Sequence, residues 1–174
     1  EIGCAYGTSA MFIINFLNNY NKKINYKIID PNQDTQWNNV GLYNISRIKN
    51  DNINVEWLKG YSDITMEYLT KQRLKYDIIF IDGGHGFEIV MSDSMYADKL
   101  LKKNGIVIHD DVLHSGVKEA INKFYKNNKH YIKISLKYDS NKPNIITDNK
   151  LYNYSKNKTN FHNPRTMFAF KKII

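Results

Sequence analysis

The sequence predicts a doubly wound α/β fold, with a mostly parallel sheet that ends in an antiparallel hairpin. Two glycines four positions apart, Gly3 and Gly7, precede a helical apolar pattern, and glycine lets a backbone turn sharply and approach a ligand closely. Short apolar runs then alternate with helical patterns, which is typical of βαβ units. Two late apolar runs have no helix between them, so they either pair as a hairpin or lie apart.

The first half of the chain divides into helices and strands by its apolar spacing. Thr8 or Ser9 is expected to cap the first helix, since either hydroxyl can accept a bond from a free backbone N–H group. Pro31 ends the first full strand because it cannot donate to a sheet. The predicted elements are a helix over 8–20, a strand over 26–30, a helix over 35–50, a strand over 53–58 and a helix over 63–72.

The second half contains the clearest strand, residues 76–82, whose continuous apolar core predicts burial on both faces. The polar segment 139–163 is predicted to be a mobile loop that closes over a bound molecule. The remaining predicted elements are a helix over 87–102, a turn at 104–105, a strand over 106–109, a helix over 117–127 and the two late strands over 131–138 and 166–172.

Length and composition fit one globular domain over residues 1–174, because the chain has 174 residues and 42% apolar content. The formal charge of +8 would suit nucleic acid, but the lysines are spread among asparagines, so nucleic acid is not an expected partner. No apolar run reaches the roughly 20 residues that cross a bilayer, so no membrane partner is expected. A homo-oligomer is compatible with the composition.

The chain has one cysteine, Cys4, which fits a reducing compartment and a cytoplasmic location. We expect Cys4 to be a small buried residue rather than a nucleophile, because no basic group lies near it in sequence to lower its pKa. The chain begins at Glu1, without the strand that should precede a glycine loop. The first strand is therefore expected to be incomplete, as in an N-terminally truncated chain.

Polar side chains follow each apolar run of the predicted sheet. The segment Glu1 to Gly7 follows the first strand, and Asp30 follows the second. Similar polar groups follow the next three strands: Tyr61, Ser62, Asp63, Asp82, His85, His109, Asp110 and Asp111. Because ligands of such sheets bind beyond the carboxyl ends of the strands, this pattern predicts a single binding crevice there.

Four segments in the order expected carry a family resemblance: 1–9, 29–37, 81–85 and 101–111. They resemble the E-x-G-x-x-x-G-x-S, second-strand, I-D-G-x-H and fifth-strand motifs of class I S-adenosyl-L-methionine (SAM)-dependent methyltransferases that act on small molecules. The resemblance covers roughly residues 1–125, and it implies a Rossmann-like sheet to which the family adds a terminal antiparallel hairpin. It departs at Asn104-Gly105, where the family usually has two glycines, a mild change because Asn tolerates positive φ.

The resemblance implies roles in cofactor binding for several of these residues. Gly3 and Gly7 would let the backbone approach the methionine part of SAM, and Glu1 would face its ammonium group. Asp30 lies at the distance from the glycine loop at which a carboxylate holds ribose hydroxyls, although a turn or helix-cap role is the alternative. Ser62 would lie near the adenine, and Asp82 would border the sulfonium and the acceptor.

Three carboxylates, Asp82, Asp110 and Asp111, sit on adjacent strand ends, where oxygen ligands suit Mg²⁺ or another hard divalent ion. Related O-methyltransferases place an ion there, while helix capping and strand anchoring are the alternative roles. His85 is the candidate general base, since an ordinary histidine accepts a proton at neutral pH; the alternative is a loop histidine bonded to a carboxylate.

Four further side chains have two interpretations each. His109 alternates with buried strand residues and is expected to be structural, while His114 is a weaker candidate for the base or metal site. Trp37 and Tyr61 would line the adenine pocket or belong to the core.

The sequence therefore predicts an enzyme of the EC 2.1.1 type that methylates an oxygen of a small acceptor, such as a sugar or secondary metabolite, with a divalent metal as a candidate second cofactor. One alternative is a nicotinamide-dependent oxidoreductase, although that class predicts a G-x-G-x-x-G motif that the chain lacks. The other alternative is a non-catalytic module that binds a nucleotide cofactor.

Overall fold

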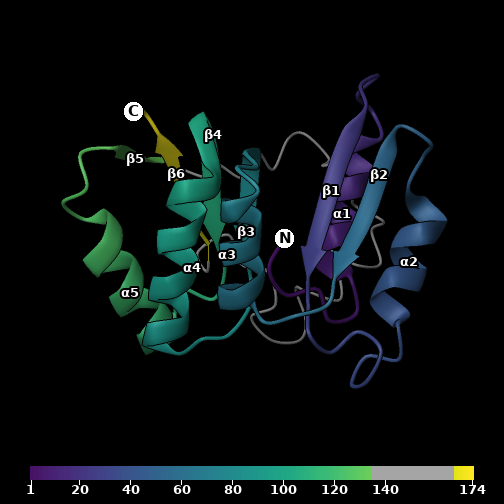
Figure 1. Cartoon of the computed structure of the whole chain (residues 1–174), viewed down its shortest axis with the longest axis horizontal. Helices are drawn as coiled ribbons and strands as arrows, with labels where there is room; N and C mark the ends of the chain where they lie inside the picture. The colour runs from purple at the N-terminus through teal and green to yellow at the C-terminus, as the bar shows by residue number, and fades with distance from the viewer. Residues whose placement is uncertain (135–166) are drawn as a thin grey trace, which may run out of the picture.

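Helices and strands alternate along the chain in a computed structural model that describes residues 1–134 and 167–174 (Figure 1). The helices are α1 (Thr8–Leu17), α2 (Val40–Ile48), α3 (Ser62–Lys71), α4 (Phe87–Leu100) and α5 (Ser115–Tyr125). The strands are β1 (Ile24–Ile29), β2 (Ile53–Leu58), β3 (Tyr76–Ile81), β4 (Leu101–His109), β5 (Tyr131–Ile134) and β6 (Phe168–Lys172).

The sheet is parallel except at its C-terminal edge. β1 pairs in parallel with β2, and β3 pairs in parallel with β4. Ile2 forms parallel bridges to Ile29 and to Ile81, so it lies between these two pairs at the position of a central strand. β6 is antiparallel to both β4 and β5, which gives the order β2, β1, Ile2, β3, β4, β6, β5. The predicted doubly wound sheet with a C-terminal antiparallel pair is confirmed.

Helices cover both faces of this sheet. Ile28 packs in the core with α1 and α2, while its neighbour Ile29 packs in the core with α3, α4 and α5. Successive side chains of a strand point to opposite faces, so the two groups of helices lie on opposite sides. Figure 1 shows α3 and α4 in front of β3 and β4, with α1 behind β1 and β2. The sheet is therefore covered by helices on both faces, as in a doubly wound fold.

Several element boundaries differ from the prediction. The second helix begins at Val40 instead of residue 35, because the chain first turns back on Asn32 and passes through positive φ at Asn38 (47°) and Asn39 (59°). The first helix begins after Gly7 in the left-handed region, and neither Thr8 nor Ser9 caps it.

Two later boundaries also differ. The turn at 104–105 lies inside β4, not before it, with Asn104 at φ 65°. Of the predicted strand 131–138 the structure contains Tyr131–Ile134. The rest of that strand and the predicted loop 139–163 lie outside the described residues.

A groove between β1 and β3 has a volume of about 1250 Å³. Backbone and side chains of both strands line it, including Ile24, Tyr26, Ile78 and Phe80. Apart from Glu1, none of the predicted site residues line it.

Composition led to two further expectations, one about Cys4 and one about membrane-spanning segments. Cys4 is buried, and burial raises the pKa of its thiol to about 12, which makes the thiolate inaccessible at neutral pH. Among the described helices, none combines the length and apolar character that a bilayer span requires.

Candidate active site

The glycine loop is held in place by close backbone packing on both sides. Gly3 (φ 80°) and Gly7 (φ 77°) adopt the left-handed region that side chains disfavour. A Cβ atom on Gly3 would lie 2.0 Å from the Asp82 carbonyl oxygen, and one on Gly7 would lie 2.9 Å from the Gly41 carbonyl oxygen. The glycines are therefore required because the loop is wedged between the end of β3 and the start of α2.

Asp30 joins the end of β1 to this loop. Its carboxylate accepts hydrogen bonds from the backbone N–H groups of Cys4 (2.9 Å) and Ala5 (3.0 Å), from that of Asn32 (2.7 Å) and from Gln33 Nε2 (3.2 Å). The residue is only 3% exposed. The predicted contact with a ribose stays a prediction, and it would require one of these bonds to open, since a carboxylate accepts about four.

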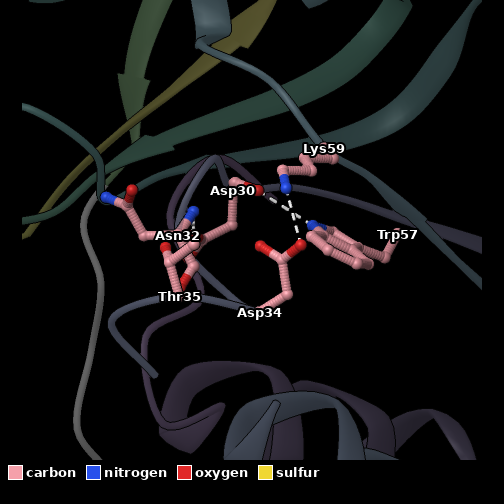
Figure 2. A network of polar contacts seen from close by, with 6 residues as sticks. All are labelled: Asp30, Asn32, Asp34, Thr35, Trp57 and Lys59. Carbon is pink, nitrogen blue, oxygen red and sulfur yellow. Dashed lines mark hydrogen bonds and ion pairs between the residues drawn. The ribbon is translucent and has the colours of Figure 1, made fainter. Parts of the chain in front are cut away.

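Figure 2 shows how β2 completes this corner. Trp57 Nε1 donates a hydrogen bond to the backbone carbonyl oxygen of Asp30 (2.8 Å). Lys59 Nζ pairs with an Asp34 carboxylate oxygen (2.6 Å), and this contact lowers the pKa of Asp34. The end of β1 is thus fixed from both sides, which places the glycine loop at the carboxyl edge of the sheet.

Glu1 lies beneath the first turn of α1. Ser9 Oγ donates to one of its carboxylate oxygens (2.5 Å) and the Tyr26 hydroxyl donates to the other (2.7 Å). Burial raises the pKa of the Glu1 carboxyl. The Ser9 hydroxyl therefore bonds to Glu1 and does not cap α1. The expected role of Glu1 toward an ammonium group stays a prediction.

Acidic side chains gather where β3 and β4 end. Burial, and after it the charges of Asp110, Asp111 and Glu1, raise the pKa of Asp82 to about 7. Asp82, His85, His109 and Asp110 line a small hollow at this edge. The backbone continues the sheet up to this point, because the Asp82 N–H donates to Ile2 and the Asp110 N–H donates to Ile81. Acidic groups are therefore concentrated at this edge of a chain whose formal charge is +8.

His85, Asp111 and His114 form the second cluster at this edge. His85 Nε2 lies 2.9 Å from an Asp111 carboxylate oxygen, and the rings of His85 and His114 stack with centroids 4.4 Å apart. One ligand atom from each of the three residues lies within 4.8 Å of the others. In the described part of the chain, the predicted metal set of Asp82, Asp110 and Asp111 is not such a group. Asp110 instead accepts a hydrogen bond from the Asp111 N–H (2.7 Å).

These features agree with a comparison of the sequence with protein families. Residues 1–112 match the family described as methyltransferase domain, which is more than half of the chain. The chain belongs to this methyltransferase family. A search of curated proteins finds no match.

Solved structures of O-methyltransferases share the fold of this methyltransferase. The Bacillus cereus O-methyltransferase in complex with SAH is 14% identical with a TM-score of 0.66, and the match covers 99% of this chain and 72% of that one. A Staphylococcus aureus protein proposed to be a caffeoyl-CoA O-methyltransferase is 18% identical with a TM-score of 0.62, covering 99% and 73%.

A third structure is that of CalS11, the TDP-rhamnose 3'-O-methyltransferase of calicheamicin biosynthesis. It is 13% identical with a TM-score of 0.60, and the match covers 80% of this chain and 66% of that one. At these identities the likeness establishes the class I methyltransferase fold.

His109 of the methyltransferase is structural, as expected. It is 1% exposed, its Nε2 lies 3.1 Å from the Tyr125 hydroxyl, and its ring packs against Phe170. Burial lowers the pKa of His109 to about 3, which favours a neutral ring at physiological pH and agrees with a structural role.

Neither of the two aromatic candidates of the methyltransferase belongs to its core. Trp37 packs edge to face against Tyr6 of the glycine loop, with centroids 4.9 Å apart, and Tyr61 is exposed at the start of α3. Both are free to border a ligand, which keeps their role beside an adenine as a prediction.

Sequence reasoning missed one buried acid of the methyltransferase, Asp93 in α4. It is fully buried, and burial raises its pKa to about 6, an effect that the neighbouring Ser62 hydroxyl opposes. The signal was present in the sequence: Asp93 interrupts the apolar stripe of Val90, Ala97 and Leu100. Asp93 lies behind Gly83 and so supports the loop that carries Asp82 and His85.

Proposed function

We propose that this methyltransferase binds SAM at the carboxyl edge of its sheet and transfers the methyl group to an oxygen of a small acceptor. Family membership supports methyl transfer, and the similar structures are named as O-methyltransferases. The single observation that carries the choice of SAM is the gathering of carboxylates beside the glycine loop, where burial and, after it, the charges of Asp110, Asp111 and Glu1 raise the pKa of Asp82.

The sign of these charges discriminates between cofactors. SAM carries a sulfonium and an ammonium group, both of which a negative crevice attracts. A nicotinamide dinucleotide carries an anionic pyrophosphate, which the same carboxylates repel. The crevice therefore favours SAM over the oxidoreductase alternative.

The elements around the crevice suit the remaining parts of the cofactor. The first turn of α1 carries no side-chain cap, so its backbone N–H groups can meet the carboxylate of a bound amino acid. In this proposal Glu1 faces the ammonium, and Gly3 and Gly7 bring the loop against the methionine part. Asp30 shapes the loop beside the ribose, and Ser62 at the start of α3 lies near the adenine.

The chain must then align the acceptor and remove its proton. Bound SAM supplies the methyl group, which is attached to a positively charged sulfur. When the methyl group is transferred, that sulfur becomes a neutral thioether. Asp111 orients His85 through Nε2 and leaves Nδ1 to accept the hydroxyl proton as the oxygen forms its bond to the methyl carbon. The carboxylate of Asp111 also stabilises the imidazolium that forms, and Asp82 borders the reacting groups.

A hard divalent ion at Asp82, Asp110 and Asp111 has weaker support. Carboxylate oxygens are the right donor type for Mg²⁺, but these three do not converge within 4.8 Å among the described residues. We therefore assign no step to such an ion.

The acceptor class that we propose is a hydroxylated small molecule such as a sugar or secondary metabolite. One similar structure is named for a nucleotide sugar and another for an acyl-CoA phenol. We propose that the chain acts in the cytoplasm and that neither nucleic acid nor a membrane is its partner. A homo-oligomer is compatible with the fold.

Calorimetric titration tests the cofactor. We expect the chain to bind SAH and SAM and to ignore NAD and NADP. Binding of a nicotinamide dinucleotide without SAH would overturn the proposal. Radiolabelled methyl transfer to a panel of sugars and phenols then tests the reaction. His85→Gln should abolish transfer and keep SAH affinity, with the exposed His130→Gln as the matched control. Binding of SAH with no methylated acceptor would favour the non-catalytic module.

A further inference from the structure

We propose that His85, Asp111 and His114 form a binding site for a borderline transition-metal ion such as Zn²⁺ or Co²⁺. The site lies at the acceptor side of the crevice, between the loop after β3 and the loop after β4. Binding of the ion rests only on these three residues and does not depend on the proposed function.

The geometry of the cluster suits a shared ion. Two ligand atoms that each lie about 2.1 Å from one ion at tetrahedral or right angles are about 3.0–3.4 Å apart. His85 Nε2 and the Asp111 oxygen are 2.9 Å apart, so an ion can replace the proton between them with little movement. His114 supplies a third ligand atom within 4.8 Å of both, and its ring, which stacks on that of His85 with 20° between the planes, must turn for its lone pair to reach the same ion.

The two loops that carry these ligands are fixed to one another through their backbones. A Cβ atom on Gly116 would lie 2.5 Å from the His85 carbonyl oxygen and 2.9 Å from the Phe87 nitrogen, so α5 begins in direct contact with the His85 loop. The His114 N–H donates to the Asp111 carbonyl oxygen (2.9 Å), which closes a turn between these two ligands. The cluster is therefore organised without relying on the His85–Asp111 contact itself.

The donor set selects the class of ion. Imidazole nitrogens suit Zn²⁺, Co²⁺, Ni²⁺ and Fe²⁺, whereas Mg²⁺ and Ca²⁺ prefer an all-oxygen set. Three protein ligands leave coordination positions open, as in catalytic zinc sites. His85 is 42% and Asp111 40% exposed in their side chains, so a small acceptor can reach those positions. Because a ligating His85 cannot also accept a proton, ion binding and base catalysis by His85 exclude each other.

Titration of the chelator-treated chain tests the site with the metal alone. We expect one Zn²⁺ per chain by calorimetry, and visible absorption bands of bound Co²⁺ that Zn²⁺ displaces. Mg²⁺ in large excess should not displace Co²⁺. His114→Ala should weaken Zn²⁺ binding by at least about tenfold, the scale for loss of a metal-site partner. His114 makes no side-chain cap to α5, so far-UV circular dichroism should stay unchanged.

A matched variant and a second ligand separate the outcomes. His130→Ala removes an exposed histidine far along the chain and should leave Zn²⁺ affinity unchanged. Unchanged Zn²⁺ affinity in His114→Ala, or displacement of Co²⁺ by Mg²⁺, would overturn the site. SAH titration of the same samples keeps this result apart from the proposed function, because His114→Ala should retain SAH affinity. In the parent chain, SAH binding without Zn²⁺ binding would refute only the metal site, and Zn²⁺ binding without SAH binding would refute only the SAM assignment.

Discussion

Asp30→Asn should loosen the glycine loop and weaken cofactor binding together. The carboxylate holds Cys4 and Ala5 of the loop through one oxygen, which also accepts from Gln33, and holds Asn32 through the other. An asparagine can keep its oxygen toward the loop. Its amide group then meets the Asn32 N–H, so that two donors face one another.

The cost follows from these contacts. A hydrogen bond to a charged acceptor contributes about 1.5–3 kcal/mol, and a neutral one contributes about 1 kcal/mol. Asp30→Asn loses one such bond and converts the other three from charged to neutral acceptors. The lost bond accounts for about 1.5–3 kcal/mol and each conversion for about 0.5–2 kcal/mol, so we expect the free energy of unfolding to fall by at least about 3 kcal/mol, a large part of the roughly 5–15 kcal/mol typical of a domain.

Urea denaturation followed by circular dichroism measures this loss, and SAH titration measures the effect on binding. Asp51→Asn is the matched control, because Asp51 is exposed in a turn. A direct ribose contact alone would weaken SAH binding and leave stability unchanged, whereas the loop contact predicts that both fall. Stability within about 0.5 kcal/mol of the parent chain would refute the reasoning.

Three further substitutions have defined outcomes. Gly3→Ala should abolish soluble folded protein, because its Cβ would lie 2.0 Å from the Asp82 carbonyl oxygen; Gly86→Ala, whose nearest contact would be 3.6 Å, should fold normally in the same expression assay. Burial raises the pKa of Asp93 to about 6, so the protonated side chain contributes its full stability below the ordinary pKa of an aspartate. That stability is lost as pH rises through about 6. Asp93→Asn should remove up to about 3 kcal/mol of that decline in urea titrations from about pH 4 to 7, and an unchanged slope would contradict it. Asp82, with a pKa of about 7, should favour SAM over SAH increasingly as pH rises through 7, and Asp82→Asn should make the ratio of the two calorimetric affinities independent of pH.

The order of elements could be predicted from the sequence because burial sets the periodicity of each segment. The strand over 53–58 agrees residue for residue with β2. The predicted helix and strand boundaries were wrong where the backbone forms a local turn. Asn38 and Asn39 adopt positive φ, which delays α2, and Asn104 does the same inside β4. A helical pattern cannot reveal such turns, since asparagine is tolerated in both states.

The sequence predicts where the candidate site lies in the fold, but it does not predict the contacts between its residues. The position of Asp30, Asp82 and His85 at one edge follows from the parallel sheet, which fixes where strands end. Their partners depend on distances between segments far apart in the sequence. The His85–Asp111 contact and the bonds from Asp30 to the loop are of this kind. Asp93 was missed although its pattern was visible, because an acid within an apolar stripe invites the interpretation of a helix edge.

The groove between β1 and β3 has a consequence for the continuity of the sheet. Beyond the bridges of Ile2, the facing edges of these strands have no partner strand among residues 1–134 and 167–174. Backbone donors and acceptors there must be hydrated or met by another extended polypeptide. The exposed Ile78 adds an apolar contact for such a polypeptide. One further extended segment along this line would therefore join β1–β2 and β3–β4–β6–β5 into a single continuous sheet.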